Sequence, residues 1–394
     1  MSSRLPKAFL ALAAAGVILS LAACGGQPRP SAGSLTASPA LADSHLVDLT
    51  WLNSEQGWAL AAAPCSSGLC PRVAVTRDGG RSWMALPVPP GLSSNWQLQI
   101  SQIRFATAKI GYLFGPALYQ TRDGGRSWRR VRSRPVEALE PAAGTIVRIV
   151  YDHGGCPGPC NRTVQESVAG SGAWHTLLRI PIAQAGDGVR AQIIRLGTKV
   201  TYVPVYGNLA GGQGGVQAVI FRSTDAGRSW QRLPDPCAFG SGANHYAAAA
   251  ISAGPRGYLA VACDSLSGTG RIFIRTSEDY GSHWGPSQRA PSGMELLATP
   301  RPGCLVLATG DVGGSGKFTY RLDVSRDNGL RWTTVVTGTT QLGAPAAIPA
   351  VLGFGTAGFG WWAGTSQEIW LSRDDGRYWR QRLFPGSAGH VHRA

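Results

Sequence analysis

Residues 76–83 read Thr-Arg-Asp-Gly-Gly-Arg-Ser-Trp, and residues 121–128 repeat the same eight letters. Four later stretches keep the pattern Ser/Thr-x-Asp-x-Gly-x-x-Trp, here called the eight-residue motif. A short Asp side chain accepts hydrogen bonds from turn amides, Gly permits positive φ, and Trp packs back on a sheet. Each copy follows an apolar run, so the motif predicts a turn between strands, with structural and not catalytic aspartates. Its fixed positions are Asp78, Gly80, Trp83, Asp123, Gly125, Trp128, Asp225, Gly227, Trp230, Asp279, Gly281, Trp284, Asp327, Gly329, Trp332, Asp374, Gly376 and Trp379.

The spacing of the motif gives the number of repeats. Successive motif aspartates lie 45, 102, 54, 48 and 47 residues apart. The gap of 102 residues is two periods, and Ser167 and Trp174 within it keep the ends of a degenerate copy that has lost its Asp and Gly. A period of about 50 residues with about four strands per unit is typical of a β-propeller. The sequence therefore predicts an all-β, seven-bladed propeller of four-stranded blades.

A second pattern places Gly before an aromatic residue, upstream of four of the motifs, at Gly57, Gly111, Gly257 and Gly360. We interpret it as the turn into the second strand of a blade. Every unit, the first and last included, then contains its own four strands. We therefore expect blades 1 and 7 to close the ring by packing face to face, with no shared strand.

Composition agrees with many short strands and a large core. The chain of 394 residues is 43% hydrophobic and holds 53 Gly, 26 Pro and 13 Trp. Its formal net charge of +15 comes almost wholly from arginine, which is typical of a GC-rich genome but also favours acidic partners. Many arginines lie inside the motif, so we expect the charge to spread around one face. No basic run with interleaved aromatics indicates nucleic-acid binding.

The N-terminus has the features of an export signal. Arg4 and Lys7 precede an apolar stretch over residues 8–21, and residues 21–24 read Leu-Ala-Ala-Cys. This ending resembles the lipobox of bacterial lipoproteins, and the resemblance implies a diacylglyceryl group on Cys24 and palmitate-type acylation. The alternative is an ordinary cleavage site with an incidental Cys. We predict a lipoprotein signal peptide (1–23), a lipidated flexible tether (24–44), the propeller (45–386) and a flexible tail (387–394). The predicted location is the extracytoplasmic face of the cell membrane.

Seven further cysteines would then lie in a compartment that permits disulfides. Close pairs in Gly/Pro-rich loops favour loop-stapling disulfides Cys65–Cys70 and Cys156–Cys160 over metal binding, and we predict neither a metal nor another cofactor. Cys237 and Cys263 form a third candidate pair, because the expected topology places them on one face. Cys304 is then left over, and we expect it to be buried and free.

The motifs resemble those of the Asp-box (BNR) propeller superfamily, over about residues 45–385. That superfamily includes sialidases, xyloglucan-cleaving glycosidases, the sortilin Vps10 domain and photosystem II assembly factors. The Gly-aromatic turn followed by Thr-Arg-Asp-Gly-Gly-Arg-Ser-Trp is most similar to the assembly factor type, in which the propeller is a binding scaffold. The resemblance thus implies a non-catalytic binding or assembly scaffold. With the predicted lipid anchor, we expect a membrane-tethered monomer that binds an unidentified protein or glycan partner.

Two alternatives stay open, a sialidase-like glycosidase and a glycan-binding module without hydrolysis. Residues 179–181 read Arg-Ile-Pro, an element that sialidases also have. Here it follows the second motif, whereas in sialidases it precedes the first. The carboxylates outside the motifs show no acid and nucleophile pair, so we predict no enzyme. A Tyr, Glu, Asp and Arg cluster at the channel mouth would favour the glycosidase, and an aromatic platform would favour the glycan-binding module.

The face opposite the motif turns carries long, varied loops, which suit a recognition surface. Asp152 and His153 facing Asp264 or Asp311 would suggest a metal site, but two or three scattered ligands are weak evidence, and we interpret them as solvated loop residues. The candidate ligand-face residues are Tyr151, Asp152, His153, Tyr206, Asn208, His245, Tyr246, Asp264 and Asp311.

Overall fold

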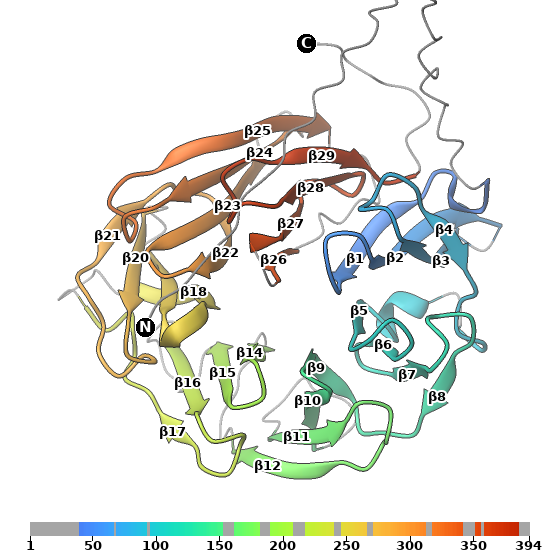
Figure 1. The fold of residues 1–394 in the computed structure, drawn as a ribbon, viewed down its shortest axis with the longest axis horizontal. Helices are drawn as coiled ribbons and strands as arrows, with labels where there is room; N and C mark the ends of the chain where they lie inside the picture. The colour runs from blue at the N-terminus through green and yellow to red at the C-terminus, as the bar shows by residue number, and fades with distance from the viewer. Residues whose placement is uncertain are drawn as a thin grey trace, which may run out of the picture. The chain divides into compact units, whose positions relative to one another are not determined.

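The computed structural model describes residues 39–66, 68–92, 95–152, 161–181, 190–207, 217–239, 246–265, 271–312, 317–341, 351–355 and 358–385. Their strands form seven separate antiparallel sheets, which stand as blades around a common axis (Figure 1). Short 3₁₀ helices η1 (Pro39–Leu41), η2 (Trp96–Leu98) and η3 (Pro255–Gly257) are the helical elements of this part of the chain. The predicted seven-bladed, all-β propeller is therefore confirmed.

The first four blades follow the chain order, and the inner strand of blade 4 is split in two. Their strands are β1 (His45–Trp51), β2 (Gly57–Cys65), β3 (Gly68–Thr76) and β4 (Met84–Leu86); β5 (Gln102–Phe105), β6 (Gly111–Phe114), β7 (Leu118–Thr121) and β8 (Arg129–Val131); β9 (Val136–Ala142), β10 (Thr145–Tyr151), β11 (Arg162–Val168) and β12 (His175–Ile180); and β13 (Arg190–Ala191), β14 (Ile194–Leu196), β15 (Val200–Gly207), β16 (Gln217–Ser223) and β17 (Gln231–Arg232).

Blades 5 to 7 repeat the same four-stranded meander. Their strands are β18 (Tyr246–Ala253), β19 (Leu259–Ser265), β20 (Ile272–Ser277) and β21 (Gln288–Ala290); β22 (Met294–Arg301), β23 (Cys304–Val312), β24 (Lys317–Ser325) and β25 (Thr333–Gln341); and β26 (Leu352–Phe354), β27 (Gly360–Ala363), β28 (Glu368–Ser372) and β29 (Arg380–Leu383).

Strands inside a blade are apolar on both faces because each face packs against a neighbouring blade. In β2, residues 57–63 are all buried. Ala59 and Ala61 enter the core shared with blade 7, whereas Trp58 and Leu60 enter the core shared with blade 2. This two-sided burial explains the near-continuous apolar runs that precede the motifs.

The ring closes between blades 7 and 1 as expected, without a shared strand. The backbone N–H of Leu46 in β1 donates to the carbonyl of Ser366 in blade 7 over 2.7 Å. A single core joins the two blades, in which Trp51 packs edge-on against Phe359 at 5.6 Å and Trp83 against Phe384 at 5.2 Å.

Residues 39–44 differ from the flexible tether predicted for them. Leu41 and Ser44 are fully buried, and Leu41 belongs to the core between blades 7 and 1. The buried Leu41, the Arg72 hydrogen bond to the Ala40 carbonyl and the Ser44 N–H donated to the Leu41 carbonyl together hold this segment on blade 1. The predicted signal peptide, Cys24 and the rest of the tether lie outside the described residues, as does the predicted tail.

The motif turns all join the third and fourth strands of their blades. Because the strands are antiparallel, these turns lie at the same end as the turns between first and second strands. We call this end of the propeller the motif face, and the opposite end the loop face. The degenerate copy from Ser167 to Trp174 occupies the equivalent turn between β11 and β12.

Candidate functional site

Every blade contributes to the wall of a central channel with a volume of about 610 Å³. Its walls are the innermost strands β1, β5, β9, β14, β18, β22 and β26, over their motif-face halves. A cavity of this size lies within the range of ligand-binding pockets in proteins. We therefore take the channel as the candidate functional site.

An arginine clamp forms one wall of the channel. Arg104 of blade 2 donates from Nη1 to Asp48 Oδ2 of blade 1 over 2.7 Å, and from Nε to Glu140 Oε1 of blade 3 over 2.8 Å. Asp48 Oδ2 also accepts from the backbone N–H of Ile103 over 2.8 Å. Three blades thus meet at one guanidinium, which forms ion pairs with both carboxylates.

Blade 4 extends this charged wall. Arg195 donates from Nη2 to Glu166 Oε1 over 3.2 Å and to Thr145 Oγ1 over 2.9 Å, both in blade 3. Its Nε is buried and has no hydrogen-bond partner among the described residues. This Nε is enclosed by protein atoms, since the Arg195 side chain is only 2% exposed.

Burial dominates the electrostatics of this wall. It raises the pKa of Asp48, although the adjacent Arg104 and backbone N–H groups oppose it. Burial also lowers the pKa of Arg195, against the nearby Glu166 and Glu140. For Arg104, burial acts to lower the pKa, but the attraction of Asp48 and Glu140 outweighs it and raises the pKa. The buried carboxylates and arginines of this wall stay ionised only while they remain paired with one another.

The opposite wall of the channel is apolar and hydroxyl-bearing. Ile251 and Leu297 line it from blades 5 and 6, and Phe354 lines it from blade 7. Ser252 and Thr299 join blades 5 and 6 through a hydroxyl pair at 2.9 Å. The channel therefore offers a ligand a charged side and an apolar side.

Sequence reasoning missed the clamp. Nothing in the sequence indicated that Asp48 and Glu140 are neighbours, and no pattern singled out Arg104 or Arg195. A β-bulge between Leu46 and Asp48 shifts the register of β1, and bulges redirect side chains in ways that strand alternation does not predict. The sequence did hold one indication of these wall residues. Except for Glu166, each of them lies on the innermost strand of its blade, which faces the channel.

The motif aspartates are engaged within their own turns. Asp123 Oδ1 accepts from Thr121 Oγ1 over 2.8 Å and from the Ser127 N–H over 2.9 Å. Hydrogen bonds from Ser229 and Ser223 likewise lower the pKa of Asp225 to about 2. In the degenerate turn the Ser167 and Ser171 hydroxyls pair at 2.9 Å instead. This geometry agrees with the structural role predicted for the motif.

The Gly-aromatic residues connect neighbouring blades. Trp58 donates from Nε1 to the Gly124 carbonyl in the motif of blade 2 over 3.1 Å. Tyr258 donates to Asn328 Oδ1 in the motif of blade 6 over 2.7 Å. Tyr202 of blade 4 is also fully buried, but its hydroxyl has no hydrogen-bond partner among the described residues.

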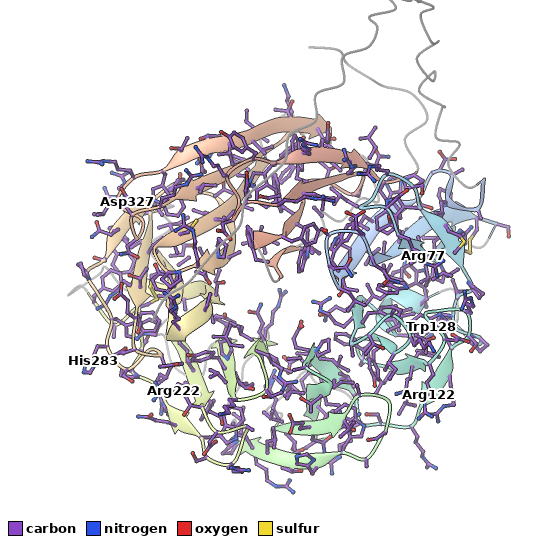
Figure 2. The ribbon with its side chains drawn as sticks, viewed as in Figure 1. Arg77, Arg122, Trp128, Arg222, His283 and Asp327 are labelled. Atoms are coloured by element: carbon purple, nitrogen blue, oxygen red, sulfur yellow. A yellow bond between two sulfur atoms is a disulfide. The ribbon has the colours of Figure 1, made fainter. Side chains whose placement is uncertain are left out.

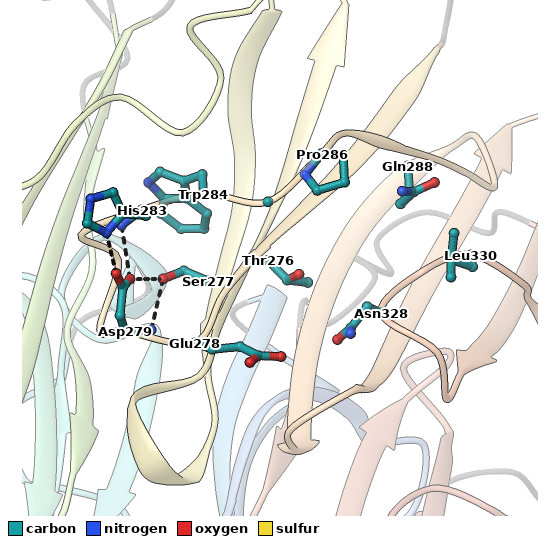
Figure 3. Close-up of a pocket in the computed structure, with 11 residues that line it drawn as sticks. Thr276, Ser277, Glu278, Asp279, His283, Trp284, Pro286, Gln288, Asn328 and Leu330 are labelled. Atoms are coloured by element: carbon teal, nitrogen blue, oxygen red, sulfur yellow. Dashed lines mark hydrogen bonds and ion pairs between the residues drawn. The ribbon is translucent and has the colours of Figure 1, made fainter.

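A second cavity, of about 580 Å³, lies on the motif face between blades 5 and 6 (Figure 3). His283 stands where three other copies carry a serine before Trp, and its Nδ1 lies 2.5 Å from Asp279 Oδ2. Leu330 and Asn328 form the blade 6 side. The polar groups here complete the motif turn, so they do not form a separate site.

On the loop face, the structure brings together a Tyr, Glu, Asp and Arg group in blade 3. Glu137 forms a two-point ion pair with Arg162, at 2.6 and 3.1 Å, and the two side chains are only 9% and 3% exposed. The Arg162 guanidinium lies 5.2 Å from the Tyr151 ring centroid. Asp152 pairs with Arg134 at 2.9 Å. Burial raises the pKa of Tyr151, and Glu137 acts in the same direction.

The predicted tyrosine platform is only partly assembled. Tyr206 and Tyr246 pack on one core, whereas Tyr151 is not part of it. Tyr246 stacks on Phe239 at 4.7 Å. Asp264 Oδ1 is buried without a described hydrogen-bond partner, and Asp311 is exposed. His153, Asn208 and His245 lie outside the described residues.

Two predicted disulfides are confirmed, Cys65–Cys70 and Cys237–Cys263. Cys304 is buried and free, and its thiol lies 3.6 Å from the Asp375 carbonyl. The Cys156–Cys160 pair lies outside the described residues. Among the residues that the structure covers, no group of three or more His, Cys, Asp or Glu side chains could hold a metal ion. No helix in this part of the chain is long and apolar enough to cross a membrane.

Solved structures share the fold. An ulvan lyase, a polysaccharide lyase, aligns with a TM-score of 0.57 over 88% of this chain and 95% of its own, at 10% identity. An ancestral GH74 enzyme aligns with a TM-score of 0.54 and 12% identity, over 87% of this chain and 46% of the enzyme. At such identities the likeness shows the fold alone.

A structure of YCF48 bound to a D1 peptide also matches, at 19% identity over 74% of this chain and 82% of that one, with a TM-score of 0.43. No protein-family model matches the chain, and no curated protein sequence matches it. Its structural neighbours thus include a protein solved with a bound peptide and a polysaccharide lyase.

Proposed function

We propose that this chain is a non-catalytic binding scaffold of the Asp-box propeller superfamily, tethered to the outer side of the membrane. The clamp in the channel carries the proposal. A glycosidase needs one carboxylate free to donate a proton and another free to attack or to activate water. Here a single guanidinium holds both Asp48 and Glu140. The charges are arranged for binding and for blade cohesion, and not for hydrolysis.

The two walls of the channel favour a short segment of a partner protein as the ligand. An apolar side chain would pack against Ile251 and Leu297, while a backbone carbonyl would face Arg104, whose side chain is 21% exposed. A saccharide would leave the apolar wall largely without a counterpart.

Crosslinking in intact membranes, followed by purification and mass spectrometry, tests this proposal. Ala253→Trp fills the channel, and Ala173→Trp makes the same change at an exposed motif-face turn. We expect a reproducible protein partner whose recovery falls at least tenfold with Ala253→Trp and is unchanged with Ala173→Trp, both variants showing wild-type circular dichroism. Equal capture by the two variants, or recovery of glycans and wall polymer alone, would refute the proposal.

The blade 3 group favours a second candidate function, a sialidase-like glycosidase, because Tyr151, Glu137 and Arg162 lie together on the loop face. Its weakness is that Glu137 is nearly buried and fully engaged. Hydrolysis of chromogenic glycosides by the purified wild type, abolished in Tyr151→Phe, would establish the enzyme. Equal or absent turnover in both proteins would reject it.

A further inference from the structure

The outer edge of blade 2 carries an unusual concentration of positive charge. Between residues 122 and 134 the chain has six arginines and one acidic residue, Asp123. The sequence led us to expect arginines spread around one face, but strand β8 and its flanks gather these six on a single edge. Figure 2 shows Arg122 and Trp128 at this part of the rim. All six are exposed, namely Arg122, Arg126, Arg129, Arg130, Arg132 and Arg134.

Little negative charge compensates this edge. Asp123 is held by its own turn, and Asp152 pairs with Arg134 alone. Arg126, Arg130 and Arg132 have no ion-pair partner among the described residues. At least three full positive charges therefore face solvent within one strand and its adjoining turns.

Apolar side chains lie beside this charge. Met84 and Val88, on and just after the outer strand of blade 1, are 48% and 39% exposed. Trp128 Nε1 donates to the Pro87 carbonyl over 3.1 Å, which holds this segment against the motif turn of blade 2. Arginines with interspersed apolar side chains are typical of surfaces that lie on anionic bilayers.

The chain enters the propeller on blade 1, the neighbour of blade 2, at the side of blade 1 that faces blade 7. Arg72 of blade 1 donates from Nε to the Ala40 carbonyl over 3.1 Å, so the segment after the tether is held on the blade that adjoins blade 2. Cys24 precedes Ala40 by 16 residues, which span at most about 55 Å when extended. A lipid group on Cys24 would thus keep the edge of blade 2 within reach of the membrane.

We propose that this edge, residues 122–134 together with Met84 and Val88, docks on the anionic phospholipid headgroups of the membrane. The proposal goes beyond the binding function assigned to the channel and does not depend on its ligand. Docking would fix the orientation of a propeller that the tether alone leaves free to rotate. Opposite charges attract over about 8–10 Å at physiological salt, so contact is needed, and high salt weakens it.

Flotation with vesicles tests the proposal, using residues 37–394, which contain every strand of the closed ring and no lipid anchor. The probes are vesicles of phosphatidylcholine with or without 40% phosphatidylglycerol, at about 0.1 M salt. The variant changes Arg126, Arg130 and Arg132 to Gln. The matched control changes Arg228, Arg232 and Arg380, which are equally exposed on blades 4 and 7, to Gln.

We expect binding to the anionic vesicles only, weakened about 100-fold in the blade 2 variant and less than threefold in the control. Equal weakening in both variants would show that net charge and not this edge is responsible. Absence of vesicle binding, with binding to a soluble anionic polymer such as polyphosphate, would overturn the proposal in favour of a polymer partner. These outcomes do not depend on the channel, so they can be interpreted even if the crosslinking experiment finds no partner there.

Discussion

Replacing Phe384 by Ala is the most direct test of how this ring is held closed. The Phe384 side chain is fully buried in the core between blades 7 and 1, with its ring centroid 5.2 Å from that of Trp83. Removing a buried Phe costs about 3–5 kcal/mol, including the lost transfer energy and the cavity. For a domain of about 350 residues, an unfolding entropy near 2.1 cal/mol/K per residue converts this loss to a fall in Tm of about 4–7 °C.

The assay is differential scanning calorimetry combined with hydrogen exchange. Phe105→Ala is the control, since Phe105 stacks on Trp58 at 3.8 Å between blades 1 and 2, where the chain itself joins the blades. We expect similar falls in Tm, but loss of amide protection in β1 and β29 only for Phe384→Ala. The role assigned to the core between blades 7 and 1 would be refuted if Phe384→Ala lowered Tm by less than about 1 °C while Phe105→Ala lowered it by the expected value of about 4–7 °C.

Three further predictions concern the turns, the disulfide and the inter-blade contacts. The hydrogen bonds that Asp123 accepts in its turn outweigh the effect of burial and lower its pKa to about 2, against about 3.9 in the unfolded chain. The stability that the ionised Asp123 contributes is therefore full above about pH 4 and is lost as the pH falls through about 2. Asp123→Asn should flatten the dependence of Tm on pH over that window. Replacing Cys237 and Cys263 by Ser opens a loop with a sequence separation of 26 and should lower the unfolding free energy in urea by about 3–4 kcal/mol. Tyr258→Phe should lower the unfolding free energy by about 1 kcal/mol in the same assay, because the Tyr258 hydroxyl has a described hydrogen-bond partner. Tyr202→Phe should be neutral or stabilising, because the Tyr202 hydroxyl has no described partner. Equal losses in the two variants would contradict this reasoning.

The fold could be predicted because its signal is local and repeated. The motif turn is built from hydrogen bonds between residues two to four positions apart, such as those around Asp123, so eight letters specify it. Counting the turns then counts the blades. Ring closure without a shared strand also followed, since each unit contained four strands of its own.

The channel could not be predicted in the same way. The Arg104 clamp joins residues 56 and 36 positions away, and its geometry depends on the angle between blades and on a bulge in β1. Likewise, the grouping of Tyr151 with Glu137 depends on which ends of β9 and β10 meet. Residues 39–44 were misjudged because composition indicated a tether, whereas the burial of Leu41 is decided by the core it meets.

Ring closure without a shared strand makes each blade a continuous piece of chain. In propellers whose last blade borrows a strand from the other terminus, cutting the chain between blades breaks a sheet. Here the chain could be opened in a loop-face connection between two blades and its original ends joined by a short linker, and every sheet would stay whole. The architecture is therefore suited to circular permutation, and to gain or loss of entire units during evolution by in-frame duplication or deletion of about 50 codons.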